Sequence, residues 1–372
     1  MYWLAVKTFF HERSRLFTTL VGIIFSTLLT ITQIAMYLGV MGNASTIIRH
    51  TDGDVWVTSR NIQNFDFANP FPEDRINRVR ALAEVDWAQR LIISWGFLKL
   101  ENGGQEQVQI VGYNPDSGVG APWSMVSGAA SDVKGGRYMI IDKTSEQRLG
   151  TLAIGQVSEL SSLRFKLVGI SEGIKSFTTA PIIFMSYNQA RLFYPQGQTT
   201  FIIAKLKDAS KAEEVSRILR DTMKDNDVYT SAGFVYKTVM YWTVQTGMGM
   251  GFFLTAILGL MIGAAIVGQT IYANTMEHIQ EFGTLKAMGA RNLDLYKIIF
   301  TQAAMSASIG YVVGTAIVFL TKNGFEKAGV TLYLSVPLFA VVFVVMLLTC
   351  FASAYISIRK VRSLDPVMVF RG

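Results

Sequence analysis

Two acidic residues one helical turn apart, Glu277 and Glu281, have the spacing that most clearly suggests a chemical task. On a helix, carboxylates four positions apart share a face, so together they could bind basic groups on another protein. Apolar side chains beside them would add contact area, and two glycines would permit close approach and a sharp exit. A connector lying among lipid headgroups is the alternative, but it gives no role to two clustered acids. The predicted contact set is Glu277, Glu281, Phe282, Gly283, Leu285, Lys286, Met288 and Gly289.

Residue types that serve catalysis or metal binding are present but do not converge. The histidines, His11, His50 and His278, fall in three different segments, whereas a metal site needs several ligands together. Cys350 lies in an apolar run and is expected to pack as a small apolar side chain. A serine-histidine-aspartate site outside the membrane would have to use His50. We therefore predict no catalytic residue, no metal site and no cofactor in this chain.

A phosphate-binding loop is also missing from the sequence. Such a loop ends in Gly-Lys-Ser or Gly-Lys-Thr, because its backbone amides and lysine hold the phosphates. Gly-Lys does not occur in the 372 residues. The chain is therefore not expected to be an enzyme, and ATP and magnesium would be bound by a partner ATPase.

Long apolar runs are the elements that must position the acidic segment. Half of the residues are hydrophobic and 16% are charged, a balance typical of a chain that is partly embedded in a membrane. Four runs contain no charged residue, and each exceeds the roughly 20 residues that a helix needs to cross a bilayer. The first run is too long for the apolar core of a signal peptide, so it is expected to remain uncleaved. The runs are Leu16–Ile48, Thr238–Met276, Ile298–Thr321 and Ala328–Ile358.

The net charge of +7 does not point to nucleic acid, because many of the cations border the apolar runs. By the positive-inside rule, the alternate borders that carry most of them are cytoplasmic, together with both termini and the acidic segment. The short loop on the other side offers only Lys322 and Lys327. The cations on the cytoplasmic side are Lys7, Arg13, Arg15, Lys286, Arg291, Lys297, Arg359, Lys360, Arg362 and Arg371.

These observations predict an α-helical membrane protein with four transmembrane helices and a large α+β extracytoplasmic domain between the first and second spans. The expected segments are a cytoplasmic interfacial helix (1–15), a first span with stalk (16–41), the α+β domain (42–237), a stalk and second span (238–276), a cytoplasmic coupling loop (277–297), a third span (298–321), a short outer loop (322–335), a fourth span (336–358) and a cytoplasmic tail (359–372).

The domain outside the membrane is predicted from its turn and strand signals. Two β-rich runs within Ala88–Tyr113 are joined by Glu-Asn-Gly-Gly, a strong hairpin signal. The run Thr199–Leu206 is expected to be a buried strand, followed by an amphipathic helix at Ala209–Lys224. With one cysteine in the chain, no internal disulfide can form, so packing alone must hold this domain.

The first two apolar runs are longer than a bilayer requires. As a single helix, Thr238–Met276 would measure about 58 Å, against about 30 Å of hydrocarbon. Helical stalks that carry the chain from the membrane to the outer domain are the expected explanation. An uncharged loop around Gly247, Gly249 and Gly251 is the alternative.

Small residues at four-residue spacing predict close helix packing, either between two copies of the chain or within one. The spans contain no charged group for a proton relay or an ion path, which disfavours passage of a substrate through them and favours a mechanical role. The small-residue pairs are Gly247 and Gly251, Gly259 and Gly263, Ala303 and Ala307, and Gly310 and Gly314.

The residues from Glu277 through Glu-Phe-Gly-Thr-Leu-Lys-Ala-Met-Gly-Ala resemble the cytoplasmic coupling helix of the FtsX/MacB-like ABC-transporter permease family. The order of spans and outer domain, and a basic stretch at 359–362 leading to Pro366, are also similar to that family. The resemblance implies that Glu281–Ala290 contacts an ATPase subunit and that two permeases form a homodimer in a bacterial inner membrane. It also implies that helical stalks transmit movement to periplasmic domains, the type VII mechanotransmission mechanism.

Without a fused ATPase, the sequence is most similar to the DevC-type permeases of that family. The resemblance then implies a separate ATPase, a periplasmic membrane-fusion adaptor and an outer-membrane channel, with export as the function. Lipoprotein extraction and activation of a periplasmic hydrolase, as in FtsX-like permeases, remain alternatives within the family. An ATP-independent membrane receptor or scaffold is the alternative from another class.

Overall fold

The computed structural model describes residues 13–177 and 180–362, with side chains described as far as Tyr355. Most of the expected interfacial helix (1–15) and C-terminal tail (359–372) lies outside the described residues. The chain divides into a helical unit, residues 1–39 and 248–372, and a sheet unit, residues 40–247. The sheet unit therefore extends beyond the expected 42–237, chiefly at its C-terminal end, where two further helical segments belong to it.

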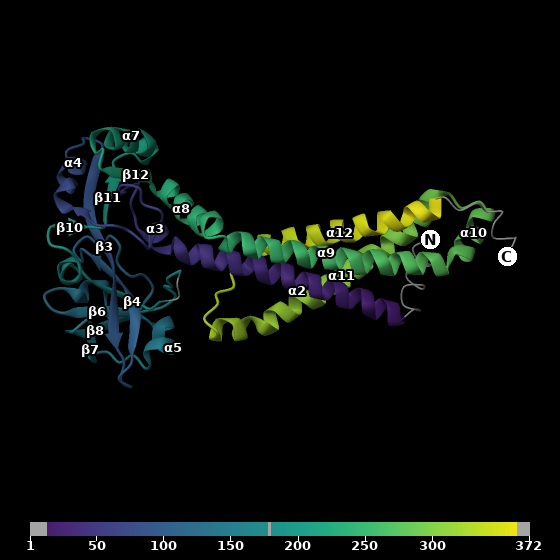
Figure 1. The fold of residues 1–372 in the computed structure, drawn as a ribbon, viewed down its shortest axis with the longest axis horizontal. Helices are drawn as coiled ribbons and strands as arrows, with labels where there is room; N and C mark the ends of the chain where they lie inside the picture. The colour runs from purple at the N-terminus through teal and green to yellow at the C-terminus, as the bar shows by residue number, and fades with distance from the viewer. Residues whose placement is uncertain (1–12, 178–179, 363–372) are drawn as a thin grey trace. The chain divides into compact units, whose positions relative to one another are not determined.

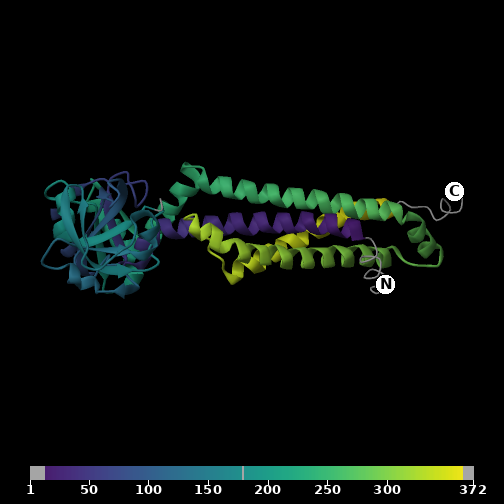
Figure 2. The same ribbon diagram turned by 90° about the horizontal axis from the view of Figure 1, so that it is seen from below.

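Four long helices run alongside one another in the helical unit (Figures 1 and 2). All four are long and apolar enough to cross a membrane, which confirms the predicted fold class. Their lengths correspond to about 40 to 54 Å, so each exceeds a bilayer core. The helices are α2 (Arg13–Ala44), α9 (Met248–Glu277), α11 (Asn292–Lys327) and α12 (Val336–Arg362).

Helix α2 packs against both α9 and α11 through the small residues that the sequence singled out. A Cβ atom added to Gly263 would lie 2.6 Å from Cβ of Ser26, and one added to Gly310 would lie 2.5 Å from Cγ2 of Ile23. The patterns that contain Gly263 and Gly310 therefore serve contacts within one chain, whereas a Cβ added to Gly247 or Gly251 would meet no atom within 4 Å. The same close approach recurs one turn along, at the pairs Gly259–Leu29 and Gly314–Thr27, and Ala303 and Ala307 are buried in the same helical core.

The run Thr238–Met276, expected to be a stalk followed by the second span, is not one continuous helix. Helix α8 (Ser231–Met240) begins before the charge-free run and leads into a short π-helix, Tyr241–Gln245. Gly247 then adopts a φ of +73°, a left-handed conformation that ends the helix, and α9 starts at the next residue. The first run is a continuous helix as far as Ala44, followed by the short α3 (Thr46–His50).

Strands organise the sheet unit, as the α+β prediction stated. Its main sheet runs in the order β12-β1-β11-β3-β4-β9-β6-β8-β5, with β7 bridging β3 and β8. The hairpin predicted from Glu-Asn-Gly-Gly is present as β3 and β4. The main-sheet strands are β1 (Val55–Ser59), β3 (Val85–Lys99), β4 (Gln105–Tyr113), β5 (Met125–Ser127), β6 (Tyr138–Asp142), β7 (Val157–Leu160), β8 (Leu163–Ser171), β9 (Ile182–Ser186), β11 (Phe201–Leu206) and β12 (Asn226–Thr230).

The fifteen-residue strand β3 joins two halves of this sheet. Its first part pairs with β11 and belongs to an open sheet. Its last part pairs with β4 and, at Leu98, with Leu160 of β7, which closes a ring of six strands: β3, β4, β9, β6, β8 and β7. Figure 1 labels most of these strands. Because a ring has no free edge between its members, its interior can bury its own apolar core.

Three apolar clusters hold the sheet unit together. One fills the ring around Phe165 and Ile183. Another packs α4 (Ile76–Arg80) and α7 (Ala212–Thr222) on the open half of the sheet. The third gathers Trp56, Phe201 and neighbouring aromatic rings. The remaining short elements are β2 (Phe71–Pro72), β10 (Gln198–Thr199), α5 (Glu146–Leu149) and α6 (Tyr187–Ala190).

Asp66 is a buried carboxylic acid of the sheet unit whose pKa is shifted by burial. Gln109 Nε2 donates a hydrogen bond to Asp66 Oδ1 at 3.1 Å. The indole of Trp242 is its other hydrogen-bonding neighbour, although the geometry of that contact is irregular. Burial raises the pKa of Asp66 to about 6, against the lowering effect of these two donors. The acid therefore keeps its proton in the folded chain at pH values where the unfolded chain has lost it.

Replacing this acid should change stability only at neutral pH. For the wild type, the free energy of unfolding should fall as pH rises from about 4 to about 6, by about 3 kcal/mol, and then level off. Asp66→Asn removes the ionisation, so its melting temperature should exceed that of the wild type near pH 7.5 and match it near pH 4. Thermal unfolding of the solubilised chain at both pH values tests this.

Asp208→Asn is a control of opposite sign. Hydrogen bonds from the side chain and backbone of Ser210 lower the pKa of Asp208, so this variant should lose stability at neutral pH. A difference in melting temperature between Asp66→Asn and the wild type that is the same near pH 4 and near pH 7.5 would contradict the assignment of Asp66.

A second prediction concerns the close packing of α2. Gly263→Ala places a methyl group against Ser26 and should destabilise the chain by about 1–3 kcal/mol. Gly251→Ala is the matched control on the same helix, because no atom lies within 4 Å of the added carbon. It should be neutral or slightly stabilising. Equal melting temperatures for the two variants would show that α2 does not pack on Gly263.

Candidate functional site

The predicted contact segment is divided by a helix break. Helix α9 ends at Glu277, His278 interrupts the regular geometry, and α10 runs from Ile279 to Ala287. The two carboxylates therefore lie on two helices and not on one continuous face. Each lies against a basic residue of the same chain: Glu277 forms an ion pair with Arg15, and a carboxylate oxygen of Glu281 lies 3.0 Å from Nδ1 of His278.

Helix α10 turns its apolar face inward. Phe282 and Leu285 pack against the core of the helical unit, and Gly283 is buried. These three residues belong to the predicted contact set, and in the structure Phe282 and Leu285 also attach α10 to its own chain. The reason is that a short helix gains stability mainly by burying its apolar side. Glu281 and Met288 point outward, and each is 71% exposed.

Leu293, in the first turn of α11, is an exposed apolar residue that the motif did not include. It is 65% exposed and follows the exit from α10 by only a few residues. Its position between two polar residues, Asn292 and Asp294, was the available signal. We call Glu281, Met288 and Leu293 the outward surface.

The exit from α10 has a defined geometry. Gly289 has a φ of +95°, and its N–H donates to the carbonyl of Lys286 at 3.0 Å. The N–H of Ala290 donates to the carbonyl of Leu285, also at 3.0 Å. This pair of bonds is the Schellman motif, which satisfies the last carbonyls of the helix and reverses the chain. Gly289 thereby fixes how α10 is followed by α11.

A small cavity with both polar and apolar lining lies behind α10. It has a volume of about 40 Å³ and is lined by residues of α9, α10 and α11, including His278, Glu281 and Gln302. That is room for about one water molecule among several polar groups. The cavity separates part of α10 from its support, while Phe282 and Leu285, which also line it, hold the helix in place.

Other residues considered for chemistry do not form a catalytic site. His50 stacks on Trp123 with ring centroids 3.9 Å apart, and its Nδ1 lies 2.8 Å from the carbonyl of Thr46. Cys350 is buried in the helical core. Within residues 13–177 and 180–362, no cluster of three potential metal ligands occurs. His11 lies outside the described residues.

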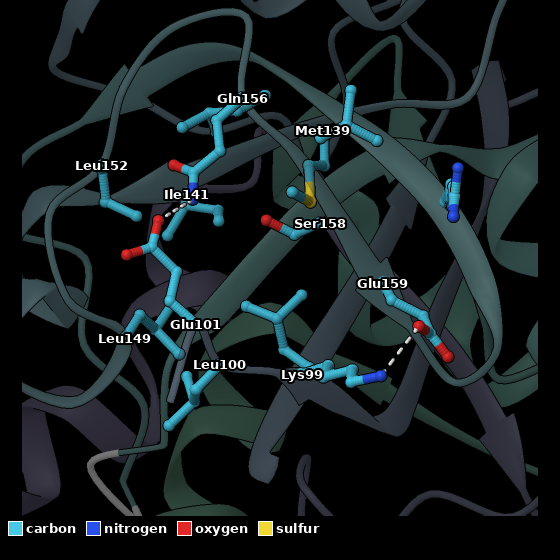
Figure 3. Close-up of a pocket in the computed structure, with 14 residues that line it drawn as sticks. Lys99, Leu100, Glu101, Met139, Ile141, Leu149, Leu152, Gln156, Ser158 and Glu159 are labelled. Atoms are coloured by element: carbon cyan, nitrogen blue, oxygen red, sulfur yellow. Dashed lines mark hydrogen bonds and ion pairs between the residues drawn. The ribbon is translucent and has the colours of Figure 1, made fainter. Parts of the chain in front are cut away.

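A recess lies on the ring of strands. Its volume is about 400 Å³. Figure 3 shows Glu101 and Gln156 turned toward each other on one side and Lys99 and Glu159 on the other. The atoms of these pairs lie 3.4 and 3.5 Å apart. Apolar residues including Met139 and Ile141 line the same recess.

Family models match nearly the whole described chain. Residues 16–222 match the model of the MacB-like periplasmic core domain, and residues 253–366 match the C-terminal region of FtsX-like permeases. The first match covers the sheet unit as far as residue 222, so that β12, α8 and the π-helix lie beyond it. The second covers α10, α11, α12 and most of α9.

Relatives of known sequence belong to the same class. An ABC transporter permease of Methanocaldococcus jannaschii is 23% identical over 232 residues, which cover 59% of this chain and 58% of that protein. The macrolide export ATP-binding/permease protein MacB of Escherichia coli is 22% identical over 408 residues, which cover 98% of this chain and 59% of that protein. The chain thus spans less than two thirds of the length of both relatives.

A solved structure, the periplasmic region of MacB from Actinobacillus actinomycetemcomitans, aligns with 50% of this chain and 92% of its own. The sequence identity is 13% and the TM-score is 0.37. The fold described above is therefore derived from the helices and strands of this chain alone.

Gly289 provides a direct test of the site geometry. In Gly289→Val, a β-branched residue would have to adopt a φ of +95°, so the exit from α10 should open at a cost of about 1–2 kcal/mol. Hydrogen exchange at the amides of Gly289 and Ala290 should become faster, while exchange in the sheet unit stays unchanged. Gly324→Val, on a helical stretch of α11 with no atom within 4 Å of an added Cβ, is the control and should leave α10 protected.

Proposed function

This chain belongs to the FtsX/MacB-like family of ABC-transporter permeases, and we propose that it transmits the ATP-driven movement of a separate ATPase subunit to its sheet unit. The observation that carries this proposal is the outward surface. Glu281 on α10, Met288 at its end and Leu293 at the start of α11 are exposed, and α10 itself is anchored from behind by Phe282 and Leu285. Such a surface can bind a partner and pass on its movement, because α10 cannot shift without moving the helices it packs on.

Contacts behind α10 suggest the route of that movement. Phe282 and Leu285 join α10 to the helical core, and the ion pair between Arg15 and Glu277 joins the start of α2 to the end of α9. Helix α2 then continues without interruption to Ala44. A close-packed helix transmits displacement along its length, since protein interiors have low compressibility.

Export of a cargo from the periplasmic side is the form of this function that we favour. The helical unit has no charged residue at mid-membrane depth with which to build a polar conduit, and ions and polar substrates require one. The macrolide export protein among the relatives supports this direction. The assembly would include a separate ATPase that binds ATP and magnesium, a membrane-fusion adaptor and an outer-membrane channel, with the termini of this chain in the cytoplasm.

A second copy of the chain would pack on a face of α9 that remains open. The glycines at 259, 263, 310 and 314 already contact α2. Gly251, with nothing within 4 Å of an added Cβ, lies on the same face as Leu254 and Leu258, which are 60% and 45% exposed. A homodimer is therefore proposed through this face of α9.

Two other functions use the same parts differently. Lipoprotein extraction or activation of a periplasmic hydrolase would share the ATPase and the outward surface but would not need the adaptor. A receptor or scaffold would need neither the ATPase nor the adaptor. Partners recovered from membranes distinguish these functions from tripartite export.

The test is affinity purification of the tagged chain from gently solubilised membranes. An ABC ATPase and a periplasmic adaptor should be recovered with the wild type. Glu281→Lys should lose most of the ATPase, because it reverses the charge that would face basic groups of the partner. Met288→Glu should do the same without disturbing the chain itself, since that side chain is 71% exposed.

Glu326→Lys is the matched control, because it makes the same change at the opposite end of α11, where Glu326 pairs with Lys322 at 3.5 Å. It should retain the ATPase. If no ATPase is recovered with the wild type, the coupling function is wrong and the receptor or scaffold function takes its place. Full recovery with both Glu281→Lys and Met288→Glu would move the contact away from the outward surface.

A further inference from the structure

A polar recess of about 520 Å³ lies at one end of the strands in the sheet unit. Strands β4 and β9 are parallel neighbours, and they end beside each other at Tyr113 and Ser186. The residues that follow both strands line the recess. Since β3 runs antiparallel to β4, its start lies at the same end, and so does the loop before β6, which runs antiparallel to β9. Crevices outside the carboxyl ends of parallel strands are common ligand sites.

Three cations line this recess: Arg80, Arg90 and Lys134. Arg80, the last residue of α4, donates from Nε and Nη2 to the carbonyl of Ala88 at 3.2 and 2.7 Å. These bonds fix the guanidinium and leave Nη1 available, and among the described residues no carboxylate forms an ion pair with Arg80. The recess therefore contains a positioned positive charge that the sheet unit does not neutralise.

The other two cations differ in how firmly they are paired. Arg90 is held by Glu73 at 2.8 Å, and Glu73 also accepts a hydrogen bond from Tyr187. Burial alone would raise the pKa of Glu73, but the hydrogen bonds from Tyr187 and Arg90 outweigh it and lower the pKa. Because Glu73 holds it, Arg90 forms a fixed part of the wall of the recess. Lys134 pairs with Asp116 at 2.6 Å, but both side chains are largely exposed, so a competing anion could take over this pairing.

Amide side chains supply the remaining polar lining. Asn114 donates to Oε1 of Gln89 at 3.3 Å. Gln189 Oε1 is buried and has no hydrogen-bond partner among the described residues. A buried acceptor without a partner is unfavourable in a folded protein. The recess thus offers cations and amides, together with one carboxylate, Asp116, that is already paired with Lys134.

We propose that this recess binds a small anionic molecule, whose carboxylate or phosphate is held by Arg80 and Lys134 and whose polar remainder meets the amides of Asn114 and Gln189. The volume suits a ligand of metabolite size. Charge-assisted hydrogen bonds from arginine and lysine are the strongest available for such oxyanions. The site is separate from the outward surface, so it goes beyond the coupling function and does not depend on it.

Calorimetric titration of the full chain in nanodiscs of neutral lipid tests the proposal. The probes are citrate for carboxylates, inorganic phosphate for phosphates and glucose as a neutral polar control. At least one oxyanion should bind saturably, and glucose should not bind. Lys134→Gln should weaken that binding about tenfold, the loss expected for one charge-assisted contact. Arg80→Gln should weaken it at least as much.

Matched controls separate the site from general charge effects. Lys143→Gln removes another exposed ion pair, with Glu172 at 3.6 Å, outside the recess, and should bind like the wild type. Arg78→Gln, on the same helix as Arg80, should also bind normally. The proposal is overturned if neither oxyanion binds, if glucose binds equally well, or if Lys134→Gln and Arg80→Gln both bind like the wild type. Glu281→Lys should retain oxyanion binding, which keeps this test independent of the ATPase contact.

Discussion

The close approach of α2 to α9 and α11 is the interaction on which the helical unit depends. Ser26 and Ile23 lie where a methyl group on Gly263 or Gly310 would have to be, so the helices meet almost backbone to backbone. In a bilayer, lipid tails solvate apolar side chains as well as a protein core does, and dispersion contact at short range becomes the main source of association. Close contact between the helix backbones, and not the hydrophobic effect, holds α2 in place. A helix held in this way moves with its neighbours.

That constraint also explains how a nine-residue helix can serve as a contact site. Helix α10 is too short to be stable alone, and Phe282 and Leu285 attach it to the bundle that α2 organises. Glu281 and Met288 are left outward because the other side is occupied. The Schellman exit at Gly289 limits how far α10 can swing relative to α11. The inward side of this short amphipathic helix anchors it, and its other side stays exposed.

The sequence was informative wherever composition alone decides the structure. Charge-free runs predicted all four long helices, and Glu-Asn-Gly-Gly predicted the β3–β4 hairpin. It could not predict the direction of Phe282, because an apolar residue beside an acid suits a partner interface as well as a core. The break at Gly247 depends on one backbone angle, and closure of the ring depends on a single bridge between Leu98 and Leu160, far apart in the chain. The outward position of Leu293 likewise follows from tertiary packing.

Closure of the ring of strands protects the sheet unit against aggregation, and no disulfide within this chain could do so, because it has one cysteine. The main sheet ends at β12 and β5, of five and three residues, and the remaining strands have neighbours on both sides. Long unpaired edges are the places where β proteins recruit further strands and aggregate. Here the longest strand, β3, lies in the interior of the sheet and its distal end is covered by β7. The topology thus protects against fibrillar association, a hazard that no covalent bond in this chain could control.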